Sequence, residues 1–107
     1  MSVKDAPIEA ITLSGVMKDL DTRGFSEHFA VENGELRGLD TGTTFAPDEI
    51  SISERHRFEG ISDPDDMAIL YAIETDSGVR GTLTDAYGVY ADPRIGDFVE
   101  QVIDPAA

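Results

Sequence analysis

Residues 67–73, Met-Ala-Ile-Leu-Tyr-Ala-Ile, form a continuous apolar run in a chain of 107 residues, 28% of which are charged. Successive side chains of a β-strand point to opposite faces, so this run presents apolar groups on both. Such a pattern is typical of a strand in the interior of a sheet. The turn-forming clusters Ser62-Asp63-Pro64-Asp65-Asp66 and Asp76-Ser77-Gly78 flank the run. We therefore expect residues 67–73 to form the central strand.

Further strands are expected on both sides of this run. Residues 50–58 alternate, and five side chains are expected to share one face that is apolar at its ends and polar in its middle: Ile50, Ile52, Glu54, His56 and Phe58. Residues 79–84 predict another strand, with Gly81 in its interior. The connections are too short for helical crossovers, so neighbouring strands are expected to be antiparallel.

An amphipathic helix is predicted over residues 8–23, after Pro7. Gly24 suits the left-handed position that follows a helix. Phe25 then falls where the residue after such a cap packs against Leu20. The helix therefore has a defined stop in the sequence.

A β-hairpin is predicted next, with strands at residues 26–32 and 35–39. Asn33-Gly34 is the favoured pair for a type I′ turn between them. Residues 40–44 are polar and are expected to be a loop that Phe45 anchors. Near the C-terminus, Asp92-Pro93 predicts an N-cap and the first position of a short last helix.

These elements predict an α+β fold in one domain, residues 1–107. We expect a mainly antiparallel meander of four to five strands, with the N-terminal and C-terminal helices packed on one face. The other face would be partly exposed, unless a partner covers it. Residues 1–7 and 104–107 are expected to be flexible.

The charge balance is strongly acidic. Twenty-two carboxylates oppose eight cationic side chains, for a formal net charge of −14. This field repels phosphate backbones and anionic lipids, so we expect neither nucleic acid nor a membrane as a partner. Such a surface either binds a basic partner or suits concentrated salt. The spread of acids from Asp5 to Asp104, with only two lysines, favours halophile-type adaptation.

The absence of cysteine excludes disulfides and thiolate zinc sites. No apolar run reaches the length of about 18 residues that suggests a membrane helix, and residues 1–7 do not resemble a secretory signal. These features predict a cytoplasmic location.

The sequence also resembles a family of small bacterial proteins of about a hundred residues without established function. Four segments carry the resemblance: Arg57-Phe58-Glu59-Gly60, Asp63-Pro64-Asp65-Asp66, Leu70-Tyr71-Ala72-Ile73 and Asp85-Ala86-Tyr87-Gly88-Val89-Tyr90. Similar sequences sometimes carry the label phosphoribosylpyrophosphate synthetase. This chain lacks the glycine-rich phosphate loop of such an enzyme, and Thr41-Gly42-Thr43 lacks the strand context of its pyrophosphate motif. The resemblance therefore implies no activity.

One set of side chains is a candidate site for a small molecule or a divalent cation: Arg57, Glu59, Asp63, Asp66, Asp85 and Tyr87. Carboxylates suit hard cations, and a guanidinium group suits carboxylate or another anion. The alternative, which we favour, is structural. Aspartates in turns bind nearby amides, and Arg55 and Arg57 are expected to pair with acids on neighbouring strands. His56 is expected to be a partly buried, hydrogen-bonded residue rather than a base.

We therefore expect a non-enzymatic interaction or regulatory domain that acts through protein contacts or self-association, by the less covered face of its sheet. The alternative is a binding domain, with weak catalysis at most, that uses the six-residue set. No catalytic residue, metal site or cofactor is assigned from the sequence, and the question of enzymatic activity stays open.

The charge balance predicts a salt dependence of stability. At molar ionic strength the screening length falls to about 3 Å, which suppresses repulsion among the carboxylates. The melting temperature is expected to rise between low and molar KCl, as thermal unfolding followed by circular dichroism would show. A flat or falling melting temperature would contradict salt adaptation.

Overall fold

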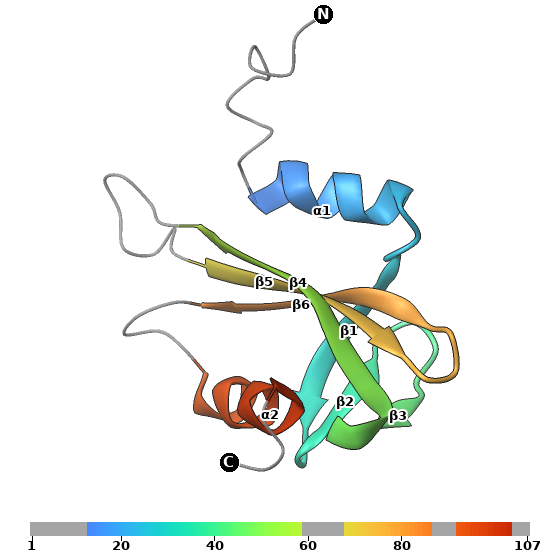
Figure 1. Cartoon of the computed structure of the whole chain (residues 1–107), viewed down its shortest axis with the longest axis vertical. Helices are drawn as coiled ribbons and strands as arrows, with labels where there is room; N and C mark the ends of the chain where they lie inside the picture. Colours follow the sequence, from blue (N-terminus) through green and yellow to red (C-terminus); the bar gives the residue numbers. More distant parts are fainter. Residues whose placement is uncertain (1–12, 59–67, 87–91, 104–107) are drawn as a thin grey trace, which may run out of the picture.

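The computed structural model describes residues 13–58, 68–86 and 92–103 (Figure 1). The fold is α+β, with two α-helices and a six-stranded sheet. The elements follow in the order α1 (Leu13–Thr22), β1 (Glu27–Glu32), β2 (Glu35–Gly38), β3 (Thr44–Phe45), η3 (Pro47–Glu49), β4 (Ile50–Phe58), β5 (Ala68–Thr75), β6 (Arg80–Ala86) and α2 (Pro93–Ile103). Neither described helix has the length and hydropathy that a membrane crossing requires.

The sheet consists of two antiparallel meanders. Its strand order is β3-β2-β1-β6-β5-β4, and β1 pairs with β6 in parallel. The expected antiparallel meander is therefore correct within each half, but the sheet has six strands and is mixed. Strand β3 was missed because two residues carry no alternation, and Thr44 was wrongly assigned to a loop. The parallel pair joins strands far apart in the sequence, which local patterns do not report.

The short link from β3 to β4 bends the sheet. These strands lie at opposite edges of it, yet Phe45 and Ile50 are five residues apart. Five extended residues span at most ~18 Å, whereas five strand spacings in a flat sheet measure ~24 Å. The sheet must therefore curl, and Phe45 and Ile50 meet in one core cluster.

Helix α2 covers the concave side of the curled sheet. Phe98 and Val99 of α2 belong there to one core cluster with side chains from all six strands: Phe29, Val31, Leu36, Phe45, Ile50, Tyr71, Ile73 and Leu83. The predicted start of α2 is confirmed, because the Asp92 carboxylate accepts the backbone N–H of Arg94 at 2.9 Å. This side holds the larger core.

Helix α1 covers the opposite face, as Figure 1 shows. Leu70 and Ala72 of β5 pack against Leu20 and Phe25, while the alternate residues of the strand face α2. The prediction that both helices share one face is therefore wrong. The physical reason lies in the central run itself: a strand that is apolar on both faces needs cover on both.

A β-bulge in β4 places the side chains before and after it on opposite faces of the sheet, so the prediction that all five alternating side chains share one face is wrong. Ile52 opposes Ile73, but the next paired residue, Glu54, opposes Ala72, so Ser53 is an extra residue. Ile50 and Ile52 consequently face the α2 side. Three side chains beyond the bulge face the α1 side instead: Glu54, His56 and Phe58.

Two predicted turns have the expected backbone. Gly24 has φ +100°, and the Phe25 N–H donates to the Leu20 carbonyl at 2.9 Å, as in a Schellman cap. Asn33 (φ +53°) and Gly34 (φ +78°) form the left-handed pair of the hairpin. Residues 8–12 of the predicted helix lie outside the described residues.

The parallel junction of β1 and β6 is built around Glu27. Its buried carboxylate accepts three backbone N–H groups, from His28 at 2.7 Å, Asp40 at 3.2 Å and Thr41 at 3.1 Å. Burial by itself raises the pKa of this carboxyl, but these donors and the Thr41 hydroxyl hold the pKa below its usual value. Gly81, opposite Glu27, lets the two backbones approach closely.

Gly81→Ala tests this close approach. A Cβ at position 81 would overlap the backbone carbonyl of Glu27, so we expect a loss of unfolding free energy of at least ~2 kcal/mol. Gly96→Ala in α2 is the matched control. Its Cβ meets nothing within 4 Å, and the change should stabilise the helix by about 0.5–1 kcal/mol. Urea unfolding measures both, and an equal effect at the two sites would contradict the proposed junction.

Candidate functional site

A groove of about 620 Å³ lies between α1 and the outer strand β4. Gly15, Val16, Asp19 and Arg23 line it from α1 and the turn that follows, and residues 55–58 line it from β4. The helical positions recur at the spacing of one helix face. Figure 1 shows α1 above the end of the sheet that β4 and β5 form.

Two contacts show how α1 is oriented relative to β4 along the groove. Near its start, Val16 and neighbouring residues of α1 pack in the cluster that Phe58 joins. At its other end, Arg23 is ion-paired with Glu54. Helix α1 therefore runs antiparallel to the second half of β4, and the two elements form opposite walls.

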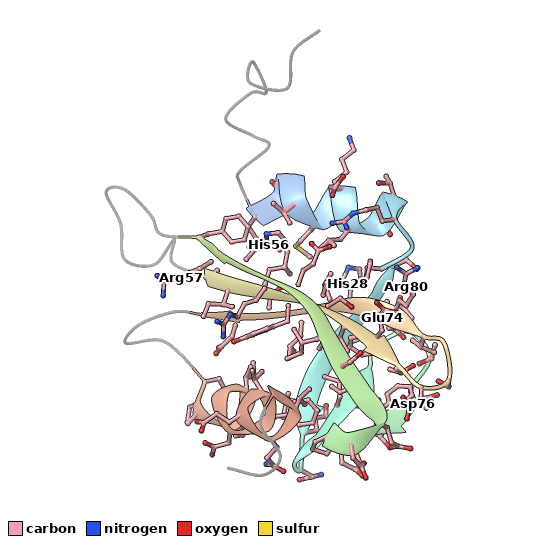
Figure 2. The ribbon with its side chains drawn as sticks, viewed as in Figure 1. His28, His56, Arg57, Glu74, Asp76 and Arg80 are labelled. Carbon is pink, nitrogen blue, oxygen red and sulfur yellow. The ribbon has the colours of Figure 1, made fainter. Side chains whose placement is uncertain are left out.

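The strand wall of the groove is a backbone edge. Side chains alternate along β4, so His56 and Phe58 face α1, whereas Arg55 and Arg57 face the other side. Figure 2 shows His56 between β4 and α1, and Arg57 pointing away from α1. A hollow bordered by four consecutive residues must follow the edge of the strand rather than one face. Strand β4 pairs only with β5 among the described strands.

An ionic cluster closes the Arg23 end of the groove. The Arg23 guanidinium donates to both oxygens of Glu54, at 2.6 and 3.1 Å, and its Nε donates to Asp19 at 3.0 Å. His56 Nε2 lies 2.8 Å from Glu54 Oε1. The hydrogen bonds from Arg23 and then His56 lower the pKa of Glu54 to about 2. Arg23 is correspondingly held in its charged form, since Glu54 raises its pKa.

The partners of His56 agree with the sequence expectation. The ring is partly buried, bound to Glu54 and stacked on Phe58 with centroids 6.5 Å apart. A carboxylate-bound imidazole can act as a base, but Glu54 is itself shared with Arg23. The geometry therefore indicates that His56 forms part of the wall of the groove rather than acting as a base.

Of the six candidate ligand-binding residues, two lie in the described part of the chain. Arg57 and Asp85 occupy one row across the sheet, because each opposes Ile69 of β5. The buried Asp85 accepts the backbone N–H of Asp92 at 3.0 Å, which ties β6 to the start of α2. The other four, Glu59, Asp63, Asp66 and Tyr87, lie outside the described residues.

For the predicted pairing of Arg55 and Arg57 with acids on neighbouring strands, the positions directly opposite on β5 hold no acid. Their neighbours on β5 are Tyr71 and Ile69. Tyr71 packs in the core under α2, and burial raises the pKa of its hydroxyl. The charge of Arg55 opposes this rise, and that of Asp85 adds to it.

Metal binding finds no support in the described part of the chain. No three carboxylate, histidine or cysteine side chains gather there in a group that could hold an ion. The Asp63-Asp65-Asp66 cluster lies outside it. Other hollows bordered by described residues include one of about 590 Å³ beside Pro47 and Val102 and one of about 310 Å³ beside Arg80 and Glu27. Neither borders a run of consecutive residues on an outer strand.

Sequence reasoning missed the α1 wall of this site. The sequence predicts Val16 and Arg23 only as parts of the helix over residues 8–23. The ion pair with Glu54 joins residues 31 positions apart, so no local spacing reports it. Comparison of the chain with protein-family models, curated proteins and solved structures finds no match.

The Glu54 ion pair predicts a specific titration. The folded-state pKa lies below the ordinary 4.5, so the pair stabilises the fold above that pH and is lost as the pH falls toward 2. Arg23→Gln is expected to raise the pKa of Glu54 toward 4.5. Carbon-detected NMR of the Glu54 carboxyl measures this, with Arg94→Gln as a remote control. A wild-type midpoint near 4.5 would contradict the described pair.

Proposed function

We propose that this chain is a protein-interaction domain that binds an extended peptide by strand addition to β4. The observation that carries the proposal is the groove along four consecutive residues of an outer strand, with α1 as its second wall. In this mode of recognition, main-chain hydrogen bonds provide affinity, and alternate side chains enter flanking pockets. The proposal makes the domain a binding module rather than an enzyme.

The dimensions suit a short segment. Residues 55–58 of β4 span about 10 Å at the rise of a strand, which corresponds to about three to four residues of a ligand. On the same side, Val16 and Phe58 provide apolar surface, and the Arg23–Glu54 pair marks the end. The groove thus combines backbone groups with side-chain contacts.

The charges of β4 oppose pairing with a second copy of the chain. In an antiparallel pair about a two-fold axis centred on residue 54, Glu54 would face its own copy. If the axis passed through residue 55 or 57, that arginine would face its own copy. If it passed through residue 56, Arg55 would face Arg57 of the other copy. Like charges directly opposite are destabilising, so the edge disfavours self-association. A peptide of different charge meets no such penalty.

The dispersed carboxylates support a second element of the proposal, a surface adapted to concentrated salt. Exposed acids occur on every layer of the fold, including Asp21 on α1, Glu35 on β2, Asp48 in η3 and Glu100 on α2. This distribution differs from a single acidic face for a basic partner. It is consistent with a domain that works in concentrated salt inside a bacterial-type cytoplasm.

Filling the groove tests the binding function. Gly15→Leu adds a bulky side chain to the α1 wall and should weaken peptide binding at least about tenfold, because the ligand and the new side chain compete for space. Gly15→Leu should also raise or preserve the melting temperature, since leucine is a better helix former than glycine. Ser14→Leu, at an exposed neighbouring position outside the groove, is the matched control.

The measurement is enrichment from a random peptide library displayed on phage, in molar KCl, followed by fluorescence anisotropy of the selected peptides. Binding by wild type and Ser14→Leu, but not by folded Gly15→Leu, supports the proposal. Selection of no peptide, or equal binding by all three proteins, would overturn it.

A further inference from the structure

We infer that the peptide bound at β4 alternates apolar and acidic side chains. This inference rests on the proposed strand addition and adds the chemistry of the ligand. An added strand continues the pleat of β4, so its side chains point alternately to the α1 side and to the opposite side. The two sides of β4 offer different surroundings.

The α1 side is apolar where the ligand would begin. Phe58 from β4 and Leu13, Val16 and Met17 from α1 all pack against the buried cluster under α1, and the His56 ring stacks on Phe58. Farther along, Arg23 and Glu54 neutralise each other through two hydrogen bonds. A ligand carboxylate on this side would compete with Glu54, whereas an aliphatic side chain would cover Val16 and Phe58. This side therefore selects apolar residues.

The opposite side of β4 carries two arginines. Arg55 is exposed there, and among the described residues it forms no ion pair. Arg57 lies two residues further along the same face. A residue of an added strand directly opposite Arg55 would lie about 5 Å from it between Cβ atoms, which lets a carboxylate meet the guanidinium group.

The local charge differs from that of the whole chain. With only eight cationic side chains against 22 carboxylates, three arginines border this one groove: Arg23, Arg55 and Arg57. Two of them, at 55 and 57, flank the backbone edge that an added strand would use. Repulsion from the rest of the molecule acts over longer distances and is screened in concentrated salt. A short-range preference for carboxylates can therefore operate at β4.

Three synthetic heptapeptides test the inference, each with valine at every second position and glutamate, glutamine or lysine between. Fluorescence anisotropy at graded KCl concentrations gives their affinities for the full chain. We expect the glutamate peptide to bind about two- to fivefold more tightly than the glutamine peptide, through one carboxylate opposite Arg55. The lysine peptide should bind most weakly near the arginines, although the net charge of −14 attracts it.

Arg55→Glu should reverse the order of the three peptides. Lys18→Glu is the matched control, because it makes the same change in net charge at an exposed position of α1 outside the groove. The control should keep the wild-type preference for glutamate. Backbone amide shifts should concentrate in residues 54–58 and in the facing residues of α1.

The outcomes separate the two proposals. Equal binding of all three peptides, or tightest binding of the lysine peptide to wild type, would overturn the acidic preference while strand addition stands. The same order of peptides in Arg55→Glu and Lys18→Glu would also overturn it. No binding by any of these peptides or by library-selected ones would overturn strand addition itself.

Discussion

The parallel contact between β1 and β6 holds the two halves of this fold together. It consists of two residue pairs, Glu27 with Gly81 and His28 with Thr82. The glycine permits the close approach, and the Glu27 carboxylate accepts the backbone N–H groups of Asp40 and Thr41 in the turn after β2. Each half is otherwise a meander of three strands, and without the junction β1 and β6 would each become an edge strand. The junction converts both into one curled sheet with a concave core.

The bulge at Ser53 divides β4 into two parts whose inward-facing side chains lie on different faces of the sheet. Before it, Ile50 and Ile52 face the concave core under α2. After it, Glu54 and His56 turn to the α1 side, where Arg23 reaches the strand. Without the extra residue, these polar side chains would occupy the core side, at a high desolvation cost. The bulge therefore also creates the strand wall of the groove.

The electrostatic potential of the molecule differs between long and short distances. Over long distances the carboxylates dominate, and salt screens them. At the edge of β4 the arginines dominate within a few ångströms, because residues 55 and 57 flank the exposed backbone. The same arginines discourage pairing between copies of the chain, as charged residues commonly do at the edges of sheets. A strand at the edge can thus stay available for a ligand of opposite charge.

Turns, caps and most strand positions were determined by the sequence alone, because their causes act over a few residues. Gly24, Asn33-Gly34 and Asp92 each take the backbone or bond that their chemistry favours. The apolar run 67–73 likewise predicted an interior strand, although β5 lies next to the edge strand β4 rather than at the centre of the sheet. It also implied helices on both faces, although the predicted fold placed them on one.

The tertiary structure alone decided the parallel pair, the bulge and the groove. The glycine at position 81 marks a close approach without indicating which backbone approaches. The alternation of residues 50–58 contains no sign of an extra residue, because polar and apolar side chains fit either register until Ile73 and Ala72 fix it. The groove depends on Arg23 and Glu54, which meet only after the sheet has curled and α1 has packed. Long-range pairing depends on what every other segment leaves uncovered, and no local pattern contains that information.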